Sequence, residues 1–500
     1  MSFHDLSVII LISLLIVWLP SFGMAKLFEK AGIPSWKAYV PFYNTWEILK
    51  VTRFRKHWFF WQFIPVVGWF ISLWLLVEFV KLFGKHSFWS HAATVLVPFL
   101  YFPYLAYHKD TRYVGYEVAR KHKKSAVREW IDAGVFAIVA ATLIRTFVFE
   151  AYTIPTGSME KTLLVNDFLF VSKLSYGPRI PNTPLAFPFV HHTMPITNSK
   201  SYSELIKLPY TRWFPRPVKR NDVVVFNFPA GDTLTREFDS KEPYYDLIRA
   251  RGRDRVWDEL TVTTRPVDKR ENYIKRCVAI AGDTIQLIDG ILYVNNEKAF
   301  ISPTASTFYY VYTTGEMDEK VLRDEGILLS KDPESTDMMA IQGGYVMNLS
   351  LTELEIIKKI PGFKSAELAI DNNYDPKIFP NDTTYFKWTV DNFGKLWIPK
   401  KGASISLTPQ NVLLYKRCIS VYENNTWEEN AGKIYINGQP ADSYTFKMDY
   451  FWMMGDNRHK SQDSRYWGFV PEDHVVGGAW MIWMSWDEGV RWNRLFKKIR

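Results

Sequence analysis

Cysteine is scarce in this 500-residue chain, which contains only Cys277 and Cys418. Two cysteines form at most one disulfide bond, so a disulfide-rich scaffold and a cysteine-rich zinc site are excluded. A Cys277–Cys418 bridge would suit an oxidising compartment. The interpretation we favour is that Cys277 packs as a small side chain on the same strand face as Lys275. No metal ion and no cofactor are expected.

Long apolar runs are absent after residue 150 and frequent before it. Four stretches approach the 20 or so residues that a helix needs to cross a bilayer, at residues 6–24, 58–80, 88–107 and 130–149. Their number favours membrane spans over buried helices of a soluble domain. Residues 1–5 lack Lys and Arg, which argues against a cleavable signal peptide, so the first span is expected to be retained.

Positive charge is concentrated between the expected spans. Lys and Arg gather in residues 26–56 and 109–128, and the positive-inside rule therefore assigns both loops to the cytoplasm. This topology puts the N-terminus and everything after residue 150 on the outer side of the membrane. It also accounts for most of the net charge of +9, so no nucleic-acid partner is expected.

The chain after residue 150 has the pattern of a mainly β domain. Short β-rich runs, separated by turn pairs such as Asp289-Gly290 and Asn437-Gly438, predict strands at residues 167–173, 222–228, 273–280, 284–294, 433–437 and 480–486. Residues 244–260 are charged and predicted to be helical, and residues 301–401 form a mixed insertion. The predicted fold class is thus an α-helical transmembrane N-terminal region followed by a mainly β domain with α+β insertions.

A weak internal similarity links two parts of the β domain. Residues 273–277 resemble residues 415–418, and residues 289–295 resemble residues 432–438. We interpret this similarity as two similar β-hairpins rather than as a duplication.

The candidate chemistry lies directly after the fourth span, in the segment IPTGSM at residues 154–159. If this segment is extended, Thr156 and Ser158 face the same way, so one hydroxyl could attack while the other donates to an oxyanion. The histidines after residue 150 form no arrangement that predicts a triad. Lys275 is the alternative base, because burial in the apolar strand 273–280 favours its neutral amine. Taken singly, each residue is explained as well by a solvated turn or a surface lysine.

The motifs together resemble those of bacterial type I signal peptidases. They are LIRTFVFE at residues 143–150, IPTGSM at 154–159, NDVVVF at 221–226, YIKR at 273–276 with Gly282-Asp283, and GDNR at 455–458 with Ser461 and DSRYWG at 463–468. The trailing IWMS at residues 482–485 also fits. The resemblance covers most of residues 143–300 and 430–500 and little of the chain between them.

The resemblance implies a role for each matching position. Ser158 is the nucleophile and Lys275 is the general base, while the Thr156 hydroxyl and the Ser158 N–H form the oxyanion hole. Four residues support the site: Ser461, which orients the lysine, and Asp463, Arg465 and Gly455. Five residues line small substrate pockets: Ile154, Met159, Leu163, Tyr273 and Ile274.

Four positions depart from the family pattern without removing a hydroxyl or an amine that the mechanism needs. Thr156 stands where Ser is common, Lys161 where Pro is frequent, Asn166 where Gly is usual and Ala281 where Pro is usual. Lys416 is a rival base, but no Gly-Asp pair follows it. The resemblance therefore implies a signal-peptidase-like β barrel with an enlarged insertion.

The domain organisation follows from the spans and the motifs. The predicted parts are a membrane region at residues 1–129, a helix leading into the catalytic domain at 130–150, a catalytic domain divided between 151–300 and 430–500, and an inserted non-catalytic subdomain at 301–429.

The implied function is a membrane-bound serine endopeptidase that removes N-terminal signal peptides with a Ser-Lys dyad. Its expected partners are preproteins with small residues at −1 and −3, the lipid bilayer and the protein-export machinery. Its expected location is the bacterial cytoplasmic membrane, with a multi-pass topology and the catalytic domain on the outer face. The alternatives are a non-enzymatic receptor or scaffold for exported chains and a self-cleaving regulator, which would need its own cleavage segment.

Overall fold

The computed structural model describes residues 7, 10–11, 20–63, 67–123, 125–239, 242–330, 336–382, 384–430 and 432–499. The chain forms two compact units, Met1–Phe147 and Val148–Arg500, which are described separately. Most of the first expected span, residues 6–24, lies outside the described residues.

The first unit is helical. Its described helices are α2 (Ser21–Lys30), η1 (Ser35–Tyr39), α3 (Tyr43–Val51), α4 (Trp58–Trp61), α5 (Val67–Lys81), α6 (Phe88–Leu96), α7 (Pro98–Tyr107), α8 (Gly115–Lys121) and α9 (Ala126–Phe147). Phe28, Phe79 and Phe102 are fully buried in a shared apolar core, and the Phe28 and Phe79 rings meet edge to face at 5.4 Å. Edge-to-face aromatic pairs of this kind stabilise an apolar core beyond the effect of their buried area.

The prediction of one continuous helix at residues 88–107 is wrong. Pro98 has no N–H to donate and disfavours helical geometry in the residue before it, so α6 ends at Leu96 and Pro98 begins α7. The stretch at 58–80 is likewise divided between α4 and the 15-residue α5. Among the described residues, α9 is the one helix that is long and apolar enough to cross a membrane.

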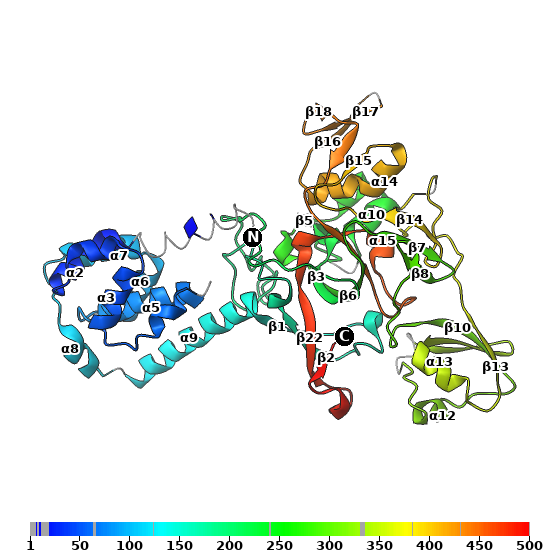
Figure 1. Ribbon diagram of the computed structural model, residues 1–500, viewed down its shortest axis with the longest axis horizontal. Coiled ribbons are helices and arrows are strands. Elements are labelled where there is room, and N and C mark those ends of the chain that lie inside the picture. Colours follow the sequence, from blue (N-terminus) through cyan, green and yellow to red (C-terminus); the bar gives the residue numbers. More distant parts are fainter. Residues whose placement is uncertain are drawn as a thin grey trace. The chain divides into compact units, whose positions relative to one another are not determined.

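The second unit is built on an antiparallel sheet in the order β1-β2-β22-β3-β6-β20-β21, with β23 beside β22 (Figure 1). Its strands are β1 (Phe149–Thr153), β2 (Asp167–Ser172), β3 (Val223–Asn227), β6 (Asn272–Ala279), β20 (Tyr450–Met454), β21 (Val470–Pro471), β22 (Val475–Ser485) and β23 (Lys497–Lys498). The predicted strands at 167–173, 222–228, 273–280 and 480–486 are confirmed. The predicted mainly β character of this region is therefore correct.

The continuous apolar run of β3 is explained by burial on both faces of the sheet. Val223 and Val225 pack into one core with the segment after β1, whereas Val224 and Phe226 pack into a second core on the opposite face. A strand covered on both sides has no solvent face and so needs no polar alternation. β3 pairs with β6 in a register that sets Val224 opposite Lys275.

Smaller sheets and short helices complete the second unit. The strands are β4 (Thr233–Thr235), β5 (Val262–Thr264), β7 (Thr284–Ile288), β8 (Ile291–Val294), β9 (Glu297–Lys298), β14 (Phe393–Trp397), β15 (Ser404–Ser406), β16 (Trp427–Asn430), β17 (Lys433–Ile436), β18 (Gln439–Pro440) and β19 (Ser443–Thr445). The helices are η2 (Gly157–Met159), η3 (Lys173–Ser175), η4 (Pro229–Gly231), α10 (Tyr244–Arg251), α11 (Arg253–Glu259), η5 (Val267–Lys269), α14 (Pro409–Arg417), η7 (Cys418–Tyr422), α15 (Ser464–Trp467), η8 (Glu472–His474) and η9 (Trp492–Arg494). The helix expected at 244–260 is thus two helices, which meet at Gly252 with φ of +83°.

The segment predicted to be an insertion contains a folded sheet with its own core. Strands β10 (Ser306–Thr313), β11 (Met338–Ile341), β12 (Gly344–Ser350) and β13 (Phe363–Leu368) form it, together with α12 (Glu319–Asp324) and α13 (Leu351–Ile357). Val311, Met347 and Ile357 are fully buried in this core. Ser350 and Glu353 form a reciprocal capping box that fixes the start of α13 directly after β12.

The internal similarity corresponds to shared hairpins only in its second half. Both Asp289-Gly290 and Asn437-Gly438 have positive φ at both residues, as tight hairpin turns require. In contrast, residues 273–277 lie in a strand and residues 415–418 are helical. Cys277 and Cys418 are both buried free thiols, so the favoured interpretation of Cys277 as a packed side chain is confirmed.

Candidate active site

The structure brings Ser158 and Lys275 into contact. Ser158 lies in the single turn η2, and Lys275 lies in the middle of β6. Lys275 Nζ donates to Ser158 Oγ at 2.5 Å, although 117 residues separate the two in sequence. This distance allows direct proton transfer between the amine and the hydroxyl.

Burial determines the protonation state of Lys275. The side chain is 4% exposed, and burial lowers its pKa to about 8 against the opposing effects of Asp463 and Asp456. Each of these carboxylates is already paired with an arginine, which limits how far either stabilises the ammonium form. A substantial fraction of Lys275 is therefore neutral near pH 8.

The segment around Ser158 is not the uniformly extended strand that the sequence suggested. Thr156 has extended geometry, with φ of −136° and ψ of 155°, but Gly157, Ser158 and Met159 form a 3₁₀ turn. Alternation along a strand therefore does not decide where the two hydroxyls point. Thr156 is exposed, whereas Ser158, in the middle of this turn, is half-buried.

Gly455 lies where no side chain fits. A Cβ at this position would be 2.2 Å from Ser461 Oγ and 2.5 Å from the Ser158 carbonyl oxygen. Ser461 is thus beside the turn that carries Ser158. Its hydroxyl is buried and has no hydrogen-bond partner among the described residues, so the expected bond to Lys275 is not formed here.

Asp463 and Arg465 form a buried ion pair. The Arg465 guanidinium donates to both carboxylate oxygens of Asp463, at 2.9 and 2.8 Å, and Asp463 also accepts from the Gly455 N–H at 3.0 Å. Burial alone would raise the pKa of Asp463, but Arg465 holds it below its ordinary value. Asp463 is the N-cap residue of α15, and Arg465 lies within this helix.

A second buried ion pair, between Arg276 and Asp456, lies outside the set of predicted site residues. Arg276 donates to both carboxylate oxygens of Asp456, at 2.8 and 2.6 Å, and Thr162 also donates to this carboxylate. The neighbouring Asn457 donates its backbone N–H to the Ser158 carbonyl and its side-chain amide to the Gly157 carbonyl. Both Asp456 and Asn457 belong to the GDNR motif at residues 455–458. This motif was the sequence signal that could have identified them as site residues.

The five predicted pocket residues divide between two cores. Ile154, Met159 and Leu163 are buried together beneath the Ser158 turn, and Ile274 packs against the edge of the same core. Tyr273 lies with the opposite core, where its ring stacks on Trp467 with centroids 5.6 Å apart.

The rival base does not reach Ser158. Lys416 is exposed on α14 and pairs with Glu429 at 2.8 Å. The histidines are also engaged elsewhere, His459 with Asp391 and His474 with Asp473. Among the described residues, no group of three or more His, Cys, Asp or Glu side chains is placed to hold a metal ion.

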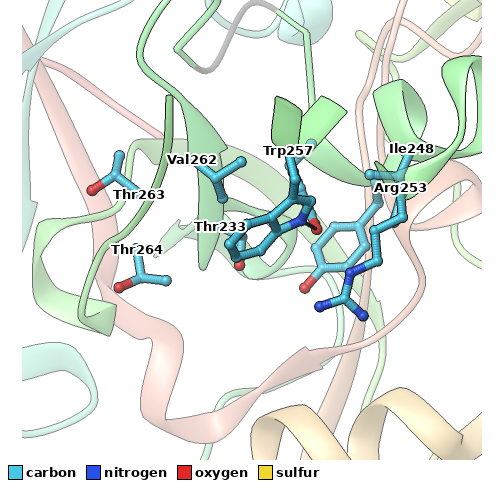
Figure 2. A pocket seen from close by; sticks show the side chains of 9 residues that line it. Thr233, Ile248, Arg253, Trp257, Val262, Thr263 and Thr264 are labelled. Atoms are coloured by element: carbon cyan, nitrogen blue, oxygen red, sulfur yellow. Dashed lines mark hydrogen bonds between the residues drawn. The ribbon is translucent and has the colours of Figure 1, made fainter. Parts of the chain in front are cut away.

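A hollow of about 540 Å³ lies between α10, α11 and the two-stranded sheet of β4 and β5 (Figure 2). Its lining residues are Thr233, Tyr244, Tyr245, Ile248, Arg253, Trp257, Val262, Thr263 and Thr264. None of them is a predicted site residue, so this hollow is separate from the Ser158–Lys275 contact.

Comparison with protein families decides the identity. Residues 127–343 and 442–486, together more than half of the chain, match the family described as signal peptidase, peptidase S26. The chain belongs to this signal peptidase family. It is therefore a serine endopeptidase that removes signal peptides. Residues 36–116 match a family of unknown function, DUF5684.

Curated relatives of this signal peptidase come from several bacteria. Signal peptidase I of Rickettsia massiliae is 25% identical over 398 residues, which cover 75% of this chain and 94% of the relative. Signal peptidase I of Buchnera aphidicola is 24% identical over 364 residues, covering 71% and 77%. That of Rickettsia bellii is 23% identical over 400 residues, covering 76% and 87%.

Proposed function

We propose that Ser158 is the nucleophile of this signal peptidase and that Lys275 is its general base. The observation that carries the proposal is the 2.5 Å contact between the buried Lys275 amine and Ser158 Oγ. With Lys275 neutral, its lone pair accepts the Ser158 proton as Oγ attacks the scissile carbonyl. The resulting ammonium protonates the leaving amine, and an acyl-enzyme forms. Neutral Lys275 then takes a proton from the water that hydrolyses the ester.

The proposed oxyanion hole consists of the Thr156 hydroxyl and the Ser158 N–H. Gly455, Ser461, Asp463 and Arg465 are proposed to hold the dyad in place. Their support is the close approach of Gly455 to the Ser158 carbonyl and the buried ion pair that accepts the Gly455 N–H. The unpartnered Ser461 hydroxyl is available to bond the lysine when substrate is bound.

The proposed substrates are exported preproteins with small residues at −1 and −3. Ile154, Met159, Leu163, Tyr273 and Ile274 are proposed to line the pockets, supported by the burial of the first three beside Ser158. Detergent-purified protein is expected to cleave a preprotein with an Ala-x-Ala site. Leucine at −1 should lower kcat/KM roughly 100-fold, because a small apolar pocket excludes it. Equal cleavage of both preproteins would contradict the pocket assignment.

The pH dependence of cleavage tests Lys275 as a base. Its pKa is about 8, and only the neutral amine accepts a proton, so activity rises with pH. We expect kcat/KM at pH 7 to be about tenfold below its value at pH 9. A rate profile measured with circular dichroism at each pH separates titration from unfolding. A profile that is flat from pH 7 to 9 would contradict the assignment.

The membrane topology is proposed to be multi-pass, with the catalytic domain on the outer face of the bacterial cytoplasmic membrane. The proposed division is a membrane region at 1–129, a final span at 130–150, catalytic segments at 151–300 and 430–500, and an insertion at 301–429. The apolar α9 directly precedes β1, which supports a catalytic domain near the bilayer. Exposed aromatic side chains suited to a lipid interface lie on β22 and after it: Trp480, Trp486, Trp492 and Phe496. Contact with the export machinery would follow from this location.

Reporter fusions test this topology. A reporter enzyme that is active only outside the cytoplasm is expected to be inactive when fused after Lys56 or Lys123 and active when fused after Gly84. The positive-inside rule assigns the two basic loops to the cytoplasm. The short connection between the second and third expected spans, which contains Gly84, is then assigned to the outside. Equal reporter activity after Lys56 and Gly84 would contradict a membrane span between these two positions. Immunoblotting controls for the amount of each fusion protein.

A further inference from the structure

Lys161 departs from the family pattern and has an unusual environment. It follows Ser158 by three residues, and it has φ of +71°, in the left-handed region that non-glycine residues seldom adopt. Its side chain is buried, and Nζ donates to the Asn348 carbonyl at 2.5 Å and to Glu353 Oε2 at 2.6 Å. A conformation of this kind persists where surrounding contacts hold it.

Both partners of Lys161 belong to the inserted sheet. Asn348 lies in β12, and Glu353 is the capping residue of α13. Glu353 is itself fixed, because it accepts from the Ser350 N–H and hydroxyl at 2.8 Å each and from the Leu328 N–H at 3.0 Å. The Glu353 carboxylate that Lys161 contacts is therefore held by residues of the insertion and not by the sheet that contains β6.

A second connection reaches the same turn through Asn457. Asn348 Nδ2 donates to Asn457 Oδ1 at 3.1 Å. Asn457 in turn donates to the Ser158 carbonyl at 3.2 Å and to the Gly157 carbonyl at 3.0 Å. Asn348 and Asn457 are almost completely buried. The turn that carries Ser158 is thus tied to β12 through Asn457 on one side and through Lys161 on the other.

We propose that the insertion is a working part of the active site, in which Lys161 and Asn457 are positioning residues that hold the Ser158 turn against β12 and α13. The inference rests on the proposed role of Ser158. A nucleophile displaced by about 1 Å loses up to about 100-fold in rate, because attack requires close alignment. Release of the turn should therefore lower kcat and leave substrate binding unchanged.

The test is the double variant Lys161→Met/Glu353→Gln, which removes both charges and leaves no buried charge unpaired. The matched control is Lys358→Met/Glu355→Gln, which removes an exposed pair at 2.6 Å on and next to α13. For both we would measure kcat and KM on a preprotein, thermal unfolding, and hydrogen exchange of the peptide that covers residues 155–163.

We expect the Lys161 variant to lose between 10- and 100-fold in kcat with KM within twofold of wild type. Exchange of residues 155–163 should rise while exchange in β3 and β6 stays unchanged, and the control should match wild type throughout. An unchanged kcat, a loss confined to KM, or a uniform rise in exchange across the protein would overturn the proposal. Hydrogen exchange does not depend on catalysis, so an inactive wild type would count against the Ser158 assignment alone.

Discussion

Replacing Ser158 by alanine is expected to reduce cleavage of an Ala-x-Ala preprotein by at least about 10⁴-fold. The variant lacks the oxygen that forms the acyl-enzyme. Lys275→Ala should cost a similar factor, because Ser158 keeps its proton when the amine 2.5 Å away is removed. The two losses should not multiply, since the residues act as one unit, and the double variant should resemble either single variant. Initial rates with the purified proteins measure all three.

A matched lysine controls for the loss of a positive charge. Lys416 belongs to the similar Lys-Arg-Cys sequence but is exposed and paired with Glu429, so Lys416→Ala should retain wild-type activity. Circular dichroism must show that each variant is folded. Full activity in folded Lys275→Ala, or loss of activity in folded Lys416→Ala, would contradict the proposed base. A folded wild-type protein that cleaves no preprotein would reopen the question of a non-enzymatic scaffold.

Gly455→Ala is expected to lower kcat at least about 100-fold. The added methyl group would lie 2.5 Å from the Ser158 carbonyl oxygen and 2.2 Å from Ser461 Oγ, and neither distance is tolerated. One of the two clashing groups belongs to the turn that carries Ser158. Relief of the clash is therefore expected to move the proposed nucleophile. Steady-state kinetics would show the loss mainly in kcat.

The control for this substitution is Gly315→Ala. Gly315 has no atom within 4 Å of an added Cβ, so its replacement should leave activity and stability unchanged. Thermal unfolding distinguishes a displaced nucleophile from general overpacking, which is also destabilising. If Gly455→Ala cleaves at the wild-type rate, the close packing against Ser158 has no part in catalysis.

The strands after residue 150 could be predicted because their signal is local. An apolar run such as that of β3 needs cover on both faces, and turn pairs such as Asn437-Gly438 need positive φ. Helix continuity was harder to predict, because hydrophobicity averaged over a window hides a single break. Pro98 divides the apolar stretch at residues 88–107, and Gly252 divides the charged stretch at residues 244–260.

The site was predictable only as far as its motifs extend. Ser158 and Lys275 could be paired because the two motifs resemble those of one family, whereas the turn at Gly157–Met159 could not be read from an extended-strand pattern. The contact between Lys161 and Glu353 spans 192 residues and belongs to no motif. Such a contact depends on how an insertion folds back onto the sheet, which composition and periodicity do not encode.

The place of β22 in the sheet has a consequence for biosynthesis. This strand is the last long strand of the chain, yet it lies between β2 and β3 and joins the part of the sheet next to Ser158 to the part that carries Lys275. A ribosome completes Ser158 and Lys275 about 200 residues before it releases this strand. The nascent polypeptide therefore holds a serine and a lysine without the scaffold that joins them. If Ser158 and Lys275 are the catalytic pair, as proposed, this protease is expected to stay inactive until its own translation is nearly complete.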